Sequence, residues 1–500
     1  EEEHAPSPPP NFNINPPIEV SNLSDNCQTP APGSLRAAMI LANQQPGQDE
    51  IVFAAGIQGS ITLDCCLPPV LESLDMHGPG AGNLRLDASN THLCNVIEYH
   101  NATPGQQQFH SLHGISIFAG ARGVQLDAHL YLHVTECTFI ENGCAPFSTI
   151  GDLCGAIRNN DGRLFVDESS FIGNYGSHGP AILQWSLLST QTHPQSSEQH
   201  YVPSVAETTI LKSTFISNEA HGSGGAISNM GGGSMEIFSS TFSDNHGHNS
   251  AGAIYSSRDS ALLIFNSTLS GNHTTGHFGA IEIGDGLLGS SVKNPYVETR
   301  LVHTTIAFNE ADDGGAIGWL KLNDGDTPPE VILHNSILAK SVAGNCEGHL
   351  HLVGQNNIQD DNTCVFHEAN NRSNLDPMLE PLDHFGGPTL THGLQQNSPA
   401  IDTAGADKCL LKDQRGAPRP MLNGCDVGAF EFGNDQDAVD GEEDGEEEHG
   451  DEHDHGFNHN HDDDEEENED TDEEEQGENN AEEHEDEYDH LDPEKCKAHQ

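Results

Sequence analysis

A short internal repeat constrains the fold of this chain more than any other feature of its sequence. A triplet with an apolar residue at its centre recurs at Phe215, Phe242 and Leu269, at a period of 27 residues. This period is short for a pair of helices and suits one coil of a stacked β-solenoid. The triplets are rich in Ser, Thr, Ile and Phe, which favours strands. The sequence therefore predicts an all-β fold, a right-handed parallel β-helix.

An asparagine follows the apolar centre of each triplet by three positions. In a stack whose strands lie about 4.8 Å apart, such amides hydrogen-bond from coil to coil while they cap turns. We therefore predict a structural ladder rather than a ligand site. The ladder consists of Asn142, Asn174, Asn218, Asn245, Asn272 and Asn309.

Three insertions lengthen the repeat at particular points and leave the triplets intact. They lie between Cys144 and Cys154, at 189–207 and at 287–297. Insertions of this kind are typical of loops that leave a solenoid.

The N-terminal segment carries a recognisable motif. Ser34-Leu35-Arg36 follows Cys27, and Pro46-Gly47 and the apolar run 51–53 come next. The segment resembles the C-S-L-R-E-A module at the start of secreted β-helix proteins, although Ala37 stands where that module has Glu. The same residues predict a short amphipathic helix that covers the open end of the stack. Its apolar residues are Leu35, Met39, Ile40 and Ala42.

Several motifs also mark the C-terminal end of the body. They are Asp376-Pro-Met-Leu379, Phe385-Gly-Gly-Pro-Thr-Leu-Thr-His392, Ser398-Pro-Ala-Ile-Asp402 and Cys425-Asp-Val-Gly-Ala-Phe-Glu431. With the repeats, they make residues 24–432 similar to bacterial β-helix proteins of the choice-of-anchor Q type. That resemblance implies an exported, surface-associated protein and does not imply a reaction, because a fold does not fix function.

Composition divides the chain into four parts. We expect a Pro-rich leader at 1–23, the β-helix with its N-terminal cap at 24–345, the last coils and a C-terminal cap at 346–433, and a disordered acidic tail at 434–500. The tail holds 33 of the 79 Asp and Glu residues and 2 of the 18 Lys and Arg, so it carries about half of the net charge of −61.

The same composition excludes two classes of protein. A strongly acidic body without a basic patch repels phosphates, which argues against nucleic-acid binding. No apolar run reaches the roughly 18–20 residues that a membrane-spanning helix requires. Because the chain opens on Glu1-Glu2-Glu3 without Met, we expect a processed form, secreted or at the cell surface, whose signal peptide has been removed.

The 12 cysteines also indicate an oxidising compartment. Short spacings predict three disulfides, whereas Cys137 fits a buried thiol. The partners of the remaining cysteines stay open at this stage, since spacing does not fix connectivity. The predicted pairs are Cys144/Cys154, Cys346/Cys364 and Cys409/Cys425, and the open positions are Cys27, Cys65, Cys66, Cys94 and Cys496.

Histidines and acids gather where the coils turn after the asparagines. We expect a polar stripe along these turns that is solvated, the alternative hypothesis being a weak site for a metal or a glycan. Asp312 and Asp313 are the best candidates for a pair of catalytic carboxylates. The stripe is formed by His178, His221, His248 and His277, with His246 and His273 beside them.

Two further groups have competing interpretations. Asp413, Arg415 and Asp426 suggest catalysis at first, but we expect an ion pair within the C-terminal cap. In the tail, clustered imidazoles suit Zn²⁺, Cu²⁺ or Ni²⁺ and the carboxylates around them suit Ca²⁺. The tail is otherwise a solubilising acidic segment. Its clustered histidines are His449, His453, His455, His459 and His461.

These observations lead to one leading function and two alternatives. The leading hypothesis is a non-enzymatic adhesion or matrix protein that binds polysaccharide or another cell-surface component, collects divalent cations with its tail and needs no organic cofactor. The first alternative is a polysaccharide lyase or glycoside hydrolase that uses the His/Asp stripe or the insertions at 189–207 and 287–297. The second is a metal-sequestering protein.

Overall fold

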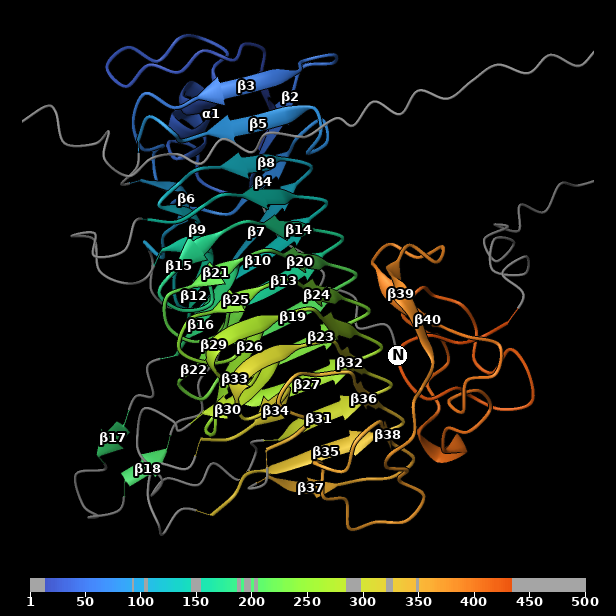
Figure 1. Cartoon of the computed structure of the whole chain (residues 1–500). Coiled ribbons are helices and arrows are strands. Elements are labelled where there is room, and N and C mark those ends of the chain that lie inside the picture. The colour runs from blue at the N-terminus through green and yellow to red at the C-terminus, as the bar shows by residue number, and fades with distance from the viewer. Residues whose placement is uncertain are drawn as a thin grey trace, which may run out of the picture. The chain divides into compact units, whose positions relative to one another are not determined.

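The computed structural model is built almost entirely of short strands stacked in coils (Figure 1). Adjacent coils are joined by parallel pairing in register, so the predicted parallel β-helix is confirmed. The structure describes residues 14–91, 94–102, 107–144, 154–186, 190–192, 199–201, 206–284, 298–320, 327–347 and 350–433. Residues 1–13 of the expected leader and the whole expected tail lie outside these ranges.

Two long parallel sheets run along the stack. The 12-stranded sheet contains β1 (Ile18–Val20), β2 (Asp49–Phe53), β4 (Leu74–His77), β7 (Gln108–His113), β10 (Leu130–Thr135), β13 (Arg163–Asp167), β19 (Glu207–Leu211), β23 (Ser234–Phe238), β27 (Ala261–Phe265), β31 (Thr299–Val302), β35 (Glu330–His334) and β37 (His351–Val353). The 11-stranded sheet contains β3 (Gly59–Thr62), β5 (Leu84–Asp87), β8 (Ser116–Phe118), β11 (Thr138–Ile140), β14 (Ser170–Ile172), β20 (Thr214–Ile216), β24 (Thr241–Ser243), β28 (Thr268–Ser270), β32 (Thr305–Ala307), β36 (Ile337–Ala339) and β38 (Ile358–Gln359).

Two shorter parallel sheets complete the coils. The eight-stranded sheet contains β6 (Asn95–Tyr99), β9 (Arg122–Leu126), β12 (Gly155–Asn160), β16 (Ile182–Trp185), β22 (Ile227–Met230), β26 (Ile254–Ser257), β30 (Ile281–Gly284) and β34 (Ile317–Gly318). The five-stranded sheet contains β15 (Tyr175–Gly176), β21 (Glu219–Ala220), β25 (His246–Gly247), β29 (His273–His277) and β33 (Glu310–Asp313). Outside the coils lie the antiparallel pairs β17 (Thr190–Thr192) with β18 (Gln199–Tyr201) and β39 (Leu379–Asp383) with β40 (Thr391–Leu394), and the 3₁₀ turn Ala406–Lys408.

The apolar centres of the triplets stack inside the coils, as the repeat predicts. Phe171, Phe215 and Phe242 occupy the same register position on β14, β20 and β24. Their rings are parallel within 2°, with centroids 4.7 Å and 4.4 Å apart, and Leu269 follows on β28. The stacked rings therefore form one continuous apolar column along the core.

The predicted asparagine ladder is also present. The side-chain amide of Asn218 donates to Asn245 Oδ1 at 2.9 Å, and that of Asn245 donates to Asn272 Oδ1 at 2.8 Å. These three side chains are fully buried. Each carbonyl also accepts the backbone N–H of the preceding asparagine, so the ladder supplies partners for turn groups that burial removes from water.

The helix α1 (Leu35–Ala42) lies at the N-terminal end of the stack (Figure 1). Ser34 caps it by accepting the N–H of Ala37. The buried Arg36 donates two hydrogen bonds to Asp25, at 2.6 Å and 2.7 Å, and others to backbone oxygens of 65 and 66. The prediction was wrong for Ile40, which is 36% exposed, because it lies on the outward face of the helix.

Five disulfides close loops in the described part of the chain. Three are the predicted pairs, Cys144–Cys154, Cys346–Cys364 and Cys409–Cys425. The other two are Cys27–Cys65 and Cys66–Cys94, so the adjacent Cys65 and Cys66 bind different segments. Cys137 is a buried thiol, as expected.

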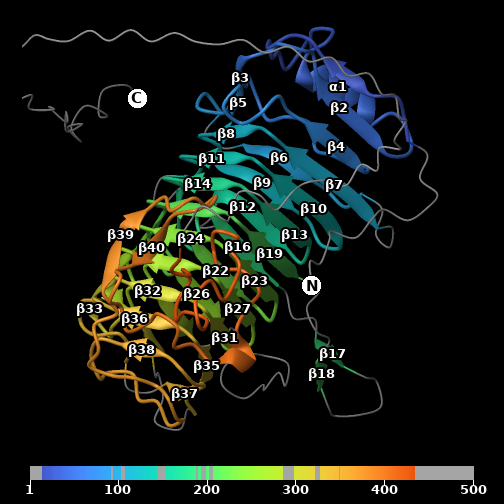
Figure 2. The same ribbon diagram turned by 90° about the vertical axis from the view of Figure 1, so that its right-hand side faces the viewer.

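The segment that follows the last coil packs along the side of the stack. In Figure 2, β39, β40 and the chain after them lie over β24, β32 and β36 of the 11-stranded sheet. Gln414 contacts Thr241 and Thr268 across 173 and 146 residues of sequence. The expected C-terminal cap is therefore partly a lateral cover, which we call the C-terminal cover (residues 379–433).

Among the described residues, no helix is long and apolar enough to cross a membrane.

Candidate functional site

The 11-stranded sheet carries an open groove near its N-terminal end. The groove has a volume of about 750 Å³ and lies over the outward side of β3, β5, β8 and β11. Its polar side chains are amides, hydroxyls and a pair of opposite charges, a mixture suited to sugar hydroxyls and carboxylates. They are Gln58, Ser60, Asn83, Arg85, Asp87, Ser116 and Thr138.

Strand alternation places these side chains. Leu86 on β5 and Ile117 on β8 point into the core and are fully buried. Their neighbours Arg85, Asp87 and Ser116 therefore point outward, since successive residues of a strand face opposite sides. Arg85 pairs with Ser116 in register, so the two side chains lie next to each other in the groove.

Two side chains in the groove, those of Arg85 and Ser116, could form further polar contacts with a ligand. The Arg85 guanidinium lies 4.5 Å from the ring centroid of Phe118 and makes no ion pair within the described residues. Ser116 is 4% exposed, and its Oγ has no hydrogen-bond partner in the part of the chain that the structure describes. A buried hydroxyl without a partner is costly, so a polar ligand that displaced the side chains over it would gain a hydrogen bond there.

Further along the same sheet, the C-terminal cover lies over the outward face, and the outward hydroxyls there form hydrogen bonds with it. Thr268 Oγ1 donates to Gln414 Oε1 at 2.6 Å and Ser270 Oγ lies 2.8 Å from His392 Nε2. Thr305 Oγ1 accepts the N–H of Ala429. These hydroxyls occupy the same outward positions as the groove residues, on coils further along the sheet. The face is therefore a row of hydroxyls, covered at one end and open at the groove.

Sequence reasoning missed the groove because the repeat was recognised only from residue 137 onward. The triplets Ser60-Ile61-Thr62, Arg85-Leu86-Asp87 and Ser116-Ile117-Phe118 are earlier copies with the same buried centre. Aligning them by their alternation would have placed Ser60, Arg85 and Ser116 in one outward column.

The structure divides the predicted histidine stripe. His221 and His248 come together, with ring centroids 5.4 Å apart. His277 lies beside Asp313, with 3.6 Å between Nδ1 and Oδ2, and His178 accepts the backbone N–H of Ser223. These positions follow from the ladder. His221 and His248 both come three residues after a ladder asparagine, whereas His178 and His277 come four and five residues after theirs.

A residue that the sequence did not single out joins this stripe. His248 Nε2 donates to Glu219 Oε1 at 2.7 Å. This hydrogen bond and the neighbouring imidazoles lower the pKa of Glu219. Burial, with His273 and His248 close by, lowers the pKa of His246 to about 4, so His246 is neutral near pH 7.

The predicted carboxylate pair lies at the end of the five-stranded sheet. Asp312 and Asp313 are both exposed on β33. The Asp313 side chain is 73% exposed and lies beside His277. Their catalytic role stays a prediction.

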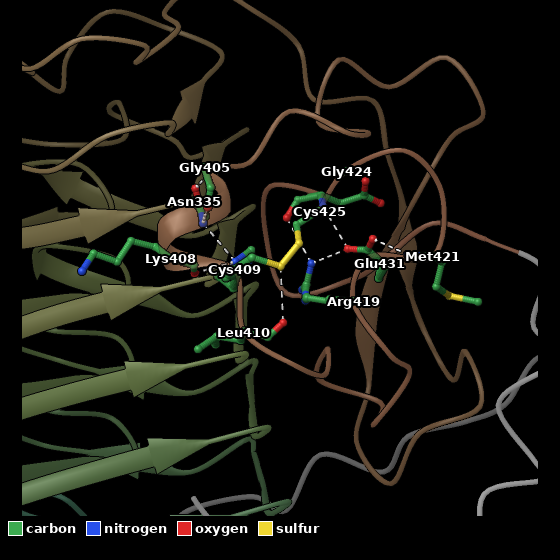
Figure 3. The surroundings of a disulfide bond; sticks show 12 residues. Asn335, Gly405, Lys408, Cys409, Leu410, Arg419, Met421, Gly424, Cys425 and Glu431 are labelled. Carbon is green, nitrogen blue, oxygen red and sulfur yellow. Dashed lines mark hydrogen bonds and ion pairs between the residues drawn. A yellow bond between two sulfur atoms is a disulfide. The ribbon is translucent and has the colours of Figure 1, made fainter.

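The charged residues near Cys425 form a buried structural network (Figure 3). Arg415 pairs with Asp413 at 2.9 Å, as expected. Asp426 instead accepts the backbone N–H groups of 402 and 432. The fully buried pair beside the disulfide is Arg419 with Glu431, 2.7 Å apart. Since Glu431 also accepts the N–H groups of 421 and 426, this pair holds the cover together.

Several predicted sites lie outside the described residues. These are all five clustered histidines of the tail, Cys496, most of the insertion at 189–207 and the insertion at 287–297. The metal-binding role of the tail and the role of the insertions stay predictions.

Comparison with known proteins gives a likeness to solved structures only. No family model matches the chain, and no curated protein matches it. Among solved structures, that of the pectate lyase Pel9A is similar, with a TM-score of 0.39 and 12% identity over 85% of this chain and 97% of that chain. At this identity the likeness concerns the fold, so the assignment of a site depends on the residues of this chain.

Proposed function

We propose that this chain is an exported β-helix protein that binds polysaccharide in the groove on its 11-stranded sheet and leaves it chemically unchanged. The groove carries the proposal, because it joins the buried, unpartnered Ser116 hydroxyl to the Arg85 guanidinium. Sugar hydroxyls suit the first group, and the carboxylate of a uronic acid suits the second.

Three features support an exported protein of the surface or matrix kind. Five disulfides favour an oxidising compartment. The N-terminal motif resembles the C-S-L-R-E-A module of secreted β-helix proteins, and the C-terminal motifs resemble those of the choice-of-anchor Q type. The acidic, histidine-rich tail would collect divalent cations, as expected of a matrix protein.

The test is binding to a panel of neutral and uronate-containing polysaccharides, measured by affinity electrophoresis and calorimetry. We expect the parent to bind a uronate polymer and Arg85→Ala to bind it about 10–100-fold more weakly, the value of a charge-assisted hydrogen bond. Arg163→Ala is the matched control, because Arg163 also lies over an aromatic ring, that of Tyr131, on the other long sheet.

Two results would contradict the proposal. One is equal binding by the parent and Arg85→Ala, with thermal melting showing that both are folded. The other is the appearance of shorter or unsaturated sugar products, which would support the lyase or hydrolase alternative.

A further inference from the structure

Four outward side chains form a square on two neighbouring coils of the five-stranded sheet. Glu219 on β21 pairs in register with His246 on β25. Backbone pairing between the coils continues past the ends of both strands. The backbone N–H of His221 donates to the carbonyl of Gly176 and that of His248 donates to the carbonyl of Ala220, each at 2.8 Å. Residues two apart on a strand face the same side, and neighbouring strands lie about 4.8 Å apart. His221 and His248 are therefore the other two corners.

Three corners of this square bring metal-ligating atoms together. One ligand atom each from Glu219, His221 and His248 lies within 4.8 Å of the other two. The carboxylate is exposed and the two imidazoles are half-buried, so an ion can reach all three from solvent. Two histidines and one glutamate are a donor set that zinc uses when it keeps its fourth position open.

We propose that Glu219, His221 and His248 bind a divalent transition-metal ion, with Zn²⁺ as the probe ion. Around a tetrahedral zinc with bonds of about 2.0–2.1 Å, ligand atoms lie roughly 3.3 Å apart. The observed group is already within small side-chain rotations of that spacing. Glu219 Oε1 and His248 Nε2 would exchange their hydrogen bond for two bonds to the ion.

The neighbouring coils explain why the site forms at this point. The columns of Glu219 and His221 continue with His273 and Thr275 on the coil after β25. Within the described ranges, no other group of three His, Cys, Asp or Glu residues brings its ligand atoms this close. The ring of the fourth corner, His246, is stacked on that of His273, with centroids 3.9 Å apart, and is tilted by 40° against that of His248, 4.1 Å away. This contact limits rotation of the His248 ring.

The experiment titrates the metal-free full chain with ZnCl₂ by calorimetry and compares variants. The tail contains further imidazoles, so the readout is the difference in stoichiometry between proteins that share that tail. We expect His248→Gln and Glu219→Gln each to bind one Zn²⁺ equivalent fewer than the parent. His273→Gln, a change in the same sheet outside the ligand set, should bind the same number.

Anomalous diffraction at the zinc edge locates the ion directly. We expect a peak between Glu219, His221 and His248 in crystals of the parent and no peak there in His248→Gln. Equal stoichiometry in all four proteins, or anomalous peaks only elsewhere, would overturn the proposal and leave the Glu219–His248 contact as an ion pair. Thermal melting checks that each variant is folded. Since the groove lies on a different sheet, this outcome is independent of polysaccharide binding.

Discussion

Replacing Asn245 by alanine should destabilise the coils strongly, because this side chain sits in the middle of the ladder. Its Oδ1 accepts two hydrogen bonds from Asn218, and its Nδ2 donates to Asn272 and to the carbonyl of Phe215. All of these contacts are buried. The truncation leaves at least the N–H of Asn218 without its partner. This buried orphan costs about 1–3 kcal/mol, and each of the other three lost hydrogen bonds costs about 1 kcal/mol. We expect the unfolding free energy to fall by about 4–6 kcal/mol.

The assay is urea unfolding followed by circular dichroism of the β-structure. The matched control is Asn249→Ala, an exposed residue of the same coil, for which we expect a change within about 0.5 kcal/mol. A loss below about 1 kcal/mol for Asn245→Ala would refute the reasoning, since it would mean that the ladder amides contribute no more than surface amides.

Three further predictions concern other parts of the body. Changing both Cys346 and Cys364 to serine removes the disulfide that closes an 18-residue loop and should lower the free energy of unfolding by about 3 kcal/mol, measured as a lowered urea midpoint without reductant; an unchanged midpoint would contradict this. Burial lowers the pKa of His110 to about 3. Below pH 6.5 the unfolded chain binds a proton that the folded chain does not, so stability falls as the pH falls. The part due to this group should be about 2 kcal/mol between pH 7.5 and 5, and His110→Gln should remove it; the same loss of stability in parent and variant would contradict this. Gln414→Ala breaks buried contacts to Thr241 and Thr268, so hydrogen exchange in residues 379–394 should accelerate while the coils stay protected; unchanged exchange there would contradict the lateral cover.

The coils could be predicted because their information is local and repeated. Each triplet carries a buried centre and each turn carries an asparagine, so Phe215 and Asn245 could be placed from sequence alone. Short spacing between cysteines predicted three of the five disulfides in the described part of the chain, because their partners are close in sequence. Spacing could not assign partners to Cys65 and Cys66. Because these two cysteines are adjacent, their distances in sequence to any third cysteine differ by only one residue.

The position of the C-terminal cover could not be predicted from the repeat. Thr268 and Gln414 are 146 residues apart, and a lone threonine on an outward strand position carries no sign of its partner. The same limit applies to Arg419 and Glu431, whose pairing depends on how the cover folds.

The proposed metal site could be predicted in part from the sequence. Its members lie one and three residues after ladder asparagines, so reading the repeat in columns brings Glu219, His221 and His248 together. Grouping the histidines by residue type instead adds His178 and His277, which lie outside these two columns.

The most direct test of the proposed function is a crystal structure of this protein soaked with a short oligouronate. We expect sugar density in the groove over β3, β5, β8 and β11, with a carboxylate at Arg85 and a hydroxyl at Ser116. Intact sugar bound on another face, or cleaved sugar at any site, would contradict it.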